Sequence, residues 1–138
     1  MNSLFVDTSG WASLFVANQP YYPQADQYFR LAFHQQKRIY TTNYIIAELV
    51  ALLNSPFWVS HSRIFEIIDA IKTADYIEVV HIDDVTDTLA WTLCKNRIDK
   101  AWSLVDSTSF IVMQQIKIQE ALTTDQHFEQ ADFIRLLK

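Results

Sequence analysis

The sequence predicts an α/β protein in which a parallel sheet is covered by helices on both faces. Short apolar runs alternate along the chain with longer stretches of helical spacing, an order typical of a parallel sheet. Half of the 138 residues are hydrophobic, which is enough for one packed domain over residues 1–138. Ligands of such folds bind outside the carboxyl ends of the strands, so candidate functional residues are sought at that edge.

The first elements follow from apolar runs and their spacing. Residues 4–6 are apolar and lead into Asp-Thr-Ser-Gly at 7–10, which predicts a buried strand followed by the start of a helix. Apolar residues recur at three- and four-residue intervals over 22–36, which predicts a helix. Residues 38–41 predict the second strand.

The middle of the chain predicts two helices and a strand. Thr42 or Asn43 caps a helix that ends before Pro56. Residues 60–74 carry four isoleucines at helical spacing, so they form the next helix. The apolar, β-branched segment 76–82 predicts the third strand.

The last third of the chain continues the alternation. Asp83 or Asp84 caps a helix, Ser103 opens another that runs to about 115, and 127–131 forms a helical turn. Two further strands are expected over 120–123 and 133–136.

Charge and cysteine content limit the function classes. The formal net charge is −5, which argues against a broad basic surface for nucleic acid, so a bound cation must offset phosphate repulsion locally. The single cysteine, Cys94, excludes an internal disulfide and is interpreted as a small buried residue on a helix. The start of the chain lacks a basic leader segment and no apolar run is long enough for a membrane span, so a cytoplasmic location is expected.

Four acids are expected to converge on the carboxyl edge of the sheet. Asp7 follows the first predicted strand, Asp125 follows the fourth, and Asp106 lies in the first turn of the helix that leads into the fourth strand. Glu48 lies about two turns into the helix after the second strand, from which it can reach the same edge. Carboxylate oxygens without a His or Cys cluster favour Mg²⁺ or Mn²⁺ over Zn²⁺.

Each acid also has a purely structural interpretation. Glu48 shares a stripe with Ile45 and Leu49, where a buried charge needs a partner or a metal, but it also fits the solvent edge of that stripe. Asp7 and Asp125 are placed to cap the helices after them, and Ser103 with Asp106 has the spacing of a capping box. Like charges gathered at one edge would raise one another's pKa, which favours a cation there.

Other polar residues carry weaker signals. The histidines lack metal-ligand spacing, and His34, His61 and His81 are interpreted as ordinary surface or core residues. His127 is either a turn residue or a contact to substrate. Asp99, with Lys100 beside it, is either a neighbour of the acid site or half of a solvated charge pair.

Four segments together resemble the motifs of PIN-domain ribonucleases. They are Val6-Asp7-Thr8-Ser9, then Thr41-Thr42-Asn43 with Ala47-Glu48-Leu49, then 99–106 with Phe110 and Met113, and lastly 121–128 with Phe133. The third and fourth motifs, in this order and at this spacing, are the specific ones. The resemblance spans nearly the whole chain, and the small stand-alone VapC-like toxins of bacterial toxin–antitoxin pairs are the type it is most similar to.

The resemblance implies a three-layer α/β/α sandwich with a five-stranded parallel sheet in the order 3-2-1-4-5. It implies that Asp7, Glu48, Asp106 and Asp125 bind Mg²⁺ or Mn²⁺ and that the protein hydrolyses RNA. It also implies a homodimer and a small antitoxin as partners. Hydrogen bonds from residues around the acids are expected to support the site, with the following candidates: Thr8, Ser9, Thr124, Asp99 and His127.

Two positions depart from the family pattern. Asp132 stands where a glycine is common, which should alter a turn and not the chemistry, and Val105 stands where threonine is frequent. All four acids are present, which favours an active enzyme over a non-catalytic PIN-like RNA- or protein-binding module.

The residues disfavour two rival functions and leave the role of one group of aromatic residues open. A receiver-like signalling domain would use an acid pair such as Asp83 and Asp84, but it also needs a second acid after the first strand. A phosphatase with an Asp-x-Asp motif would need an acid at position 9, which is serine. The aromatic residues near loop ends form either a partner surface or ordinary core, and they are Tyr21, Tyr22, Phe57 and Trp58.

Overall fold

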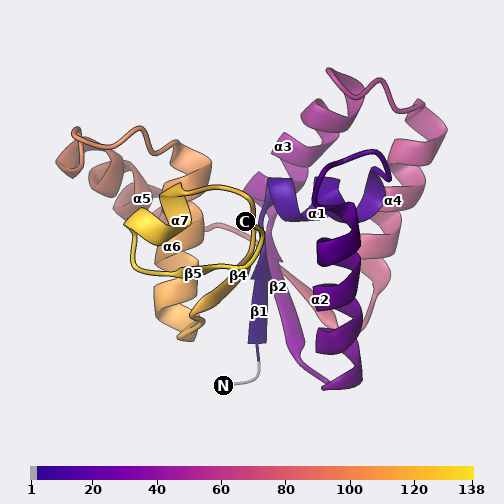
Figure 1. Ribbon diagram of the computed structural model, residues 1–138. Helices are drawn as coiled ribbons and strands as arrows, with labels where there is room; N and C mark the ends of the chain where they lie inside the picture. Colours follow the sequence, from indigo (N-terminus) through magenta and orange to yellow (C-terminus); the bar gives the residue numbers. More distant parts are fainter. Residues whose placement is uncertain (1–2) are drawn as a thin grey trace.

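The computed structural model describes residues 3–138 and contains a five-stranded sheet in which all neighbouring strands are parallel (Figure 1). The strand order is β3-β2-β1-β4-β5, which confirms the expected order. Receiver domains share the flavodoxin-like order 2-1-3-4-5, so the sheet excludes that alternative. Met1 and Asn2, on which the expectation of no leader segment partly depends, lie outside the described residues.

The strands are β1 (Ser3–Val6), β2 (Arg38–Thr42), β3 (Ile77–Val80), β4 (Glu120–Leu122) and β5 (Ile134–Arg135). The helices are α1 (Thr8–Phe15), α2 (Tyr22–His34), α3 (Asn43–Asn54), α4 (His61–Thr73), α5 (Asp84–Asn96), α6 (Leu104–Ile116) and α7 (His127–Gln130). Every predicted element is present, and the differences lie at the ends.

Side-chain caps set the starts of the four helices from α3 to α6. Thr42, Ser60, Asp83 and Ser103 each accept a hydrogen bond from the backbone N–H three residues later. The structure thereby selects Thr42 over Asn43 and Asp83 over Asp84 as caps. At the other end of α2, Gln36 has φ 59°, a left-handed conformation that ends the helix before residue 36.

The helices divide between the two faces of the sheet. Helices α1 to α4 lie on one side and α5 to α7 on the other (Figure 1). This division follows from right-handed crossovers, because the chain first builds outward from β1 through β2 to β3 and then returns past β1 to add β4 and β5. All strands point the same way, so the loops after β1 and β4 meet at one edge, beside the central strand β1.

The core lies on both faces of the sheet and comes close to the site edge. Phe5 and Leu49 are fully buried, and Phe128 of α7 packs against Phe110 of α6 with ring centroids 5.0 Å apart. The contact of α1 with β4 is so close that a Cβ on Gly10 would lie 2.0 Å from the carbonyl oxygen of Leu122. Position 10 therefore requires glycine for space.

The structure corrects one expectation and makes two others more specific. Cys94 is half-buried and not buried, with its Sγ 3.1 Å from Ser107 Oγ. Asp132 itself adopts φ 69°, the left-handed conformation that favours glycine, so the turn forms without one. Among the four aromatic residues near loop ends, Trp58 is 79% exposed whereas Tyr21 and Phe57 pack against the core.

Within residues 3–138, no helix has both the length and the apolar character that crossing a membrane requires.

Candidate active site

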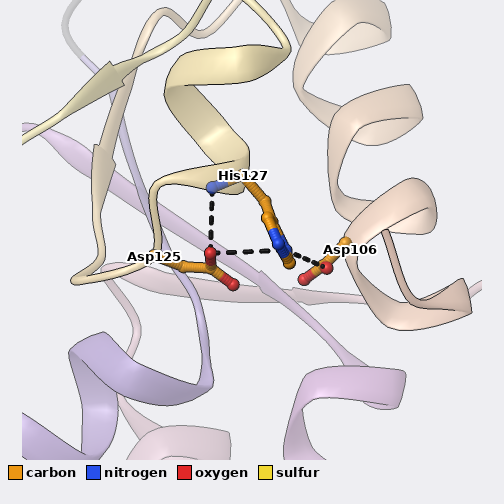
Figure 2. Close-up of side chains that lie close together, drawn as sticks. All are labelled: Asp106, Asp125 and His127. Atoms are coloured by element: carbon orange, nitrogen blue, oxygen red, sulfur yellow. Dashed lines mark hydrogen bonds and ion pairs between the residues drawn. The ribbon is translucent and has the colours of Figure 1, made fainter. Parts of the chain in front are cut away.

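The structure brings two of the predicted acids into direct reach of each other and places a histidine between them. Asp106 lies in the first turn of α6, Asp125 follows β4, and His127 is the first residue of α7. Each of the three offers one potential ligand atom, and these atoms lie within 4.8 Å of one another (Figure 2). This group forms the centre of the candidate site.

Asp7 lies directly after β1 and is the buried acid of the site, with 8% exposure. Its Oδ1 accepts hydrogen bonds from the Gly10 backbone N–H at 2.9 Å and from Ser9 Oγ at 2.8 Å. Its Oδ2 accepts one from Thr123 Oγ1 at 2.6 Å. The carboxylate thus caps α1 and, through Thr123, is tied to the strand that leads to Asp125.

Burial raises the pKa of Asp7 to about 7, although the hydrogen bonds from Thr123, Gly10 and Ser9 act in the opposite direction. The charge of Asp125 adds a smaller upward contribution. Repulsion between carboxylates was expected to raise the pKa values in this cluster. For Asp7 that explanation is secondary, because removal from water is the main cause.

Thr123 is a site residue that the sequence argument missed in favour of its neighbour Thr124. It is fully buried, donates to Asp7, and accepts a hydrogen bond from the Asp125 backbone N–H at 3.0 Å. Thr124 contributes its backbone instead, donating its N–H to Ser9 Oγ at 2.9 Å. Strand alternation could not have distinguished Thr123 from Thr124, because Ala121 and Leu122, on opposite faces of the strand, are both fully buried.

Asp106 has the structural role expected of it and retains a free oxygen. Ser103 and Asp106 form a reciprocal capping box, in which Asp106 Oδ2 accepts from the Ser103 backbone N–H at 3.1 Å. His127 Nδ1 lies 3.0 Å from the same oxygen. Asp106 Oδ1 accepts no hydrogen bond from any residue within 3–138.

Asp125 is held in a similar way. Its Oδ1 accepts from the His127 backbone N–H at 2.9 Å and lies 3.3 Å from His127 Nδ1. In the part of the chain that the structure describes, nothing donates to Oδ2. His127 was interpreted as more of a turn residue than a functional one, but its side chain faces both acids (Figure 2).

Glu48 is exposed, so the argument that its charge is buried among apolar residues was wrong. It nevertheless reaches the site edge, because Thr8 Oγ1 donates a hydrogen bond to its Oε1. Thr8 is the residue after Asp7, so this contact joins α3 to the start of α1. The side chain is anchored at one oxygen and open to solvent at the other.

The remaining candidates separate clearly. Thr8 and Ser9 contact Glu48 and Asp7, as described above. Asp99 is exposed and pairs with Arg97 at 3.2 Å and with Lys100 at 3.8 Å. Among residues 3–138 it has no hydrogen bond to any of the four acids, so the structure matches the solvated charge pair.

The donor set fits a hard divalent cation. Asp106, Asp125 and Glu48 each leave one carboxylate oxygen without a hydrogen bond from the described residues, and such oxygens are the ligands that Mg²⁺ and Mn²⁺ prefer. The three acids come from α6, the loop after β4 and α3. Thr123 links Asp125 to Asp7, and Thr8, the residue after Asp7, bonds to Glu48. Such an arrangement can hold a cation against a phosphate group.

Comparison with known proteins gives matches over almost the whole chain. The PIN domain family matches residues 4–134. Two curated relatives from two strains of Mycobacterium tuberculosis, both named 23S rRNA-specific endonuclease VapC20, are 31% identical over 133 residues, covering 96% of this chain and 97% of theirs. The crystal structure of M. tuberculosis VapC20, described as a sarcin-ricin loop cleaving toxin, matches with a TM-score of 0.85 and 30% identity, covering 99% of this chain and 100% of that chain.

Proposed function

This chain belongs to the PIN domain family, and from that premise we propose that it is a Mg²⁺- or Mn²⁺-dependent endoribonuclease that acts as the toxin of a toxin–antitoxin pair. The observation that carries the proposal is the convergence of Asp106 and Asp125 beside buried Asp7, each of the first two with an oxygen free for a cation. A relative of the same length is named as an RNA endonuclease, which supports RNA as the substrate class.

Asp7, Glu48, Asp106 and Asp125 would hold the ion, which when bound would lower the pKa of a water molecule and neutralise charge on the scissile phosphate. The chain's own residues supply the framework. Thr123 and Gly10 orient Asp7, and Thr8 orients Glu48. The buried position of Asp7 next to the sheet keeps its carboxylate in one orientation.

Cations at the end of α5 and in the loop between α5 and α6 would assist RNA binding in this acidic chain. Arg97 stacks over Trp102 at 5.0 Å, and Trp102 donates to Gln130 of α7 at 3.0 Å. These contacts keep the loop beside the helix that carries His127. Exposed Lys95 and the neighbouring Arg97 and Lys100 would then face the RNA backbone near the acids, while the net charge elsewhere disfavours unspecific binding.

The proposed partners are a second copy of the chain and a small antitoxin. Trp58 and Phe65 are 79% and 64% exposed near the ends of α3 and α4, which suits an apolar partner surface. Light scattering would give the mass of the purified protein alone and with the product of the adjacent gene. A monomer that ignores that product would contradict this part of the proposal.

The nuclease itself is tested by cleavage of a mixed set of tRNA, rRNA fragments and single-stranded oligonucleotides in Mg²⁺, Mn²⁺ or EDTA. Asp106→Asn and Asp7→Asn should abolish cleavage, whereas Asp69→Asn, the same change at an exposed acid on α4, should leave it intact. Cleavage that needs metal and disappears in the two site variants supports the proposal. Cleavage that persists in EDTA or in those variants contradicts it.

A further inference from the structure

The imidazole of His127 contacts both central carboxylates at once. Its Nδ1 lies 3.0 Å from Asp106 Oδ2 and 3.3 Å from Asp125 Oδ1 (Figure 2). The side chain is 22% exposed and that of Asp106 is 16% exposed. The His127 side chain is therefore partly shielded from water and lies between the two negatively charged groups Asp106 and Asp125.

The hydrogen bonds fall on only one oxygen of each acid. Asp106 Oδ2 receives both His127 Nδ1 and the Ser103 backbone N–H, and Asp125 Oδ1 receives the His127 backbone N–H. Among residues 3–138, Asp106 Oδ1 and Asp125 Oδ2 receive none. His127 thus contacts Asp106 Oδ2 and Asp125 Oδ1, and it leaves Asp106 Oδ1 and Asp125 Oδ2 available.

We propose that His127 is a positioning residue: its ring Nδ1–H donates to Asp106 and its backbone N–H donates to Asp125, and together these bonds hold the two acids in the orientation in which their free oxygens bind the divalent ion. The inference rests on the proposed metal-dependent function. A carboxylate oxygen only accepts hydrogen bonds, so Nδ1 must carry the hydrogen. A neutral imidazole with its hydrogen on Nδ1 meets this requirement, so the role does not depend on a charged ring.

The ring N–H of His127 acts in two ways. It fixes the rotation of the Asp106 carboxylate, which otherwise has several orientations, and its partial positive charge, which also lies 3.3 Å from Asp125 Oδ1, offsets the repulsion between the two acids. Partners of this kind behind a metal ligand typically contribute about 10- to 100-fold to metal affinity. The fold positions the donor by starting α7 at His127, with the residue's own N–H already bonded to Asp125.

Substitution of His127 by alanine, asparagine or glutamine separates the effect of hydrogen-bond donation from Nδ1 from the effect of side-chain volume. The amide nitrogen of asparagine can take the place of Nδ1, whereas the longer glutamine places its amide nitrogen near Nε2. Mn²⁺ affinity is measured by calorimetry on chelator-treated protein, with His61→Ala as a control at an exposed histidine on α4. Thermal melts in EDTA show whether each variant is folded.

We expect His127→Ala and His127→Gln to bind Mn²⁺ about 10- to 100-fold more weakly, and His127→Asn to recover to within a few-fold of the wild type. Pulsed electron paramagnetic resonance of the Mn²⁺-loaded protein should show no nitrogen bonded directly to the ion. Equal affinity in His127→Ala and the wild type would overturn the inference. A directly bound nitrogen that disappears in His127→Ala would also overturn it, because His127 would then be a ligand.

The same experiment separates this inference from the proposed function. If Mn²⁺ binds to the wild type and is lost in Asp106→Asn, while His127→Ala has no effect, only the role of His127 is wrong. If the wild type binds no Mn²⁺, or if Asp106→Asn binds it equally well, the metal-dependent function is wrong and the inference is overturned with it.

Discussion

Replacing Asp7 with asparagine should abolish cleavage and yet stabilise the metal-free protein at neutral and higher pH. The wild-type carboxyl group has a pKa of about 7 in the folded protein and 3.8 as a reference value, mainly because it is buried. A folded-state pKa that is raised stabilises the protein below the lower value and loses this contribution as the pH rises through the higher one. Asparagine keeps the shape and does not titrate.

The magnitude follows from the two pKa values. Each pH unit between about 4 and 7 removes about 1.4 kcal/mol from the wild-type free energy of unfolding, which amounts to about 4 kcal/mol in total. Between pH 5 and pH 8 the change is about 3 kcal/mol on the same basis. The advantage of Asp7→Asn over the wild type should therefore grow by that amount and become constant above pH 7.

Urea unfolding in EDTA at pH 5, 6, 7 and 8 measures this difference directly. Asp69→Asn serves as the control, because it makes the same change at an exposed acid on α4. Adding Mn²⁺ at pH 8 should raise the free energy of unfolding of the wild type, because the ion binds the folded state, and should leave that of Asp7→Asn unchanged. A difference between Asp7→Asn and wild type that stays flat from pH 5 to 8 would refute the assignment of a raised pKa to Asp7.

Three other substitutions probe the packing and the hydrogen bonds around the site. Gly10→Ala should cost about 3 kcal/mol or more by urea unfolding, because its Cβ would lie 2.0 Å from the Leu122 carbonyl oxygen, and a melting temperature equal to wild type would contradict that contact. Thr123→Val removes the hydroxyl that donates to Asp7, so it should raise the pKa of Asp7 further and weaken Mn²⁺ binding at pH 7. Thr123→Ser keeps the hydroxyl and should bind Mn²⁺ normally. Equal Mn²⁺ affinities of the two variants by calorimetry would exclude a role for this hydroxyl. Leu49→Ala, at a fully buried position of α3, should lower the free energy of unfolding by about 2–5 kcal/mol in urea titrations, and a smaller loss would mean that the helix repacks.

The sequence predicted the elements of the fold well because their signals are local. Apolar periodicity and cap residues act over a few positions, which is why the start at Ser103 was correct and the caps of α3 and α5 were narrowed to two neighbours each. The cap at Ser60 was not predicted. The order of the strands is a long-range property, and it came from the resemblance to a family and not from spacing.

The positions of the acids along the fold could be predicted from the sequence, but the hydrogen bonds that orient them could not, because those bonds are also long-range. Asp7 and Asp125 were placed at one edge because strand ends of a parallel sheet meet there. The bonds that orient them join residues far apart, such as Thr123 to Asp7 and His127 to Asp106, and no local pattern reports such pairs. The burial of Glu48 was mispredicted for a different reason. The spacing of apolar residues on a helix does not show whether a residue at the margin of the apolar face is buried or exposed.

The position of β1 between β2 and β4 also determines when the candidate site is completed during synthesis of the chain. Phe5 of β1 pairs with Ala121 of β4, and Asp7 accepts a hydrogen bond from Thr123. The first strand to be synthesised therefore obtains these partners only when nearly the last strand has been made. Pairings this distant in sequence form slowly. A nascent chain on the ribosome therefore lacks the bond between Thr123 and Asp7, and the RNA cleavage proposed above would begin only after β4 has been released and has inserted beside β1.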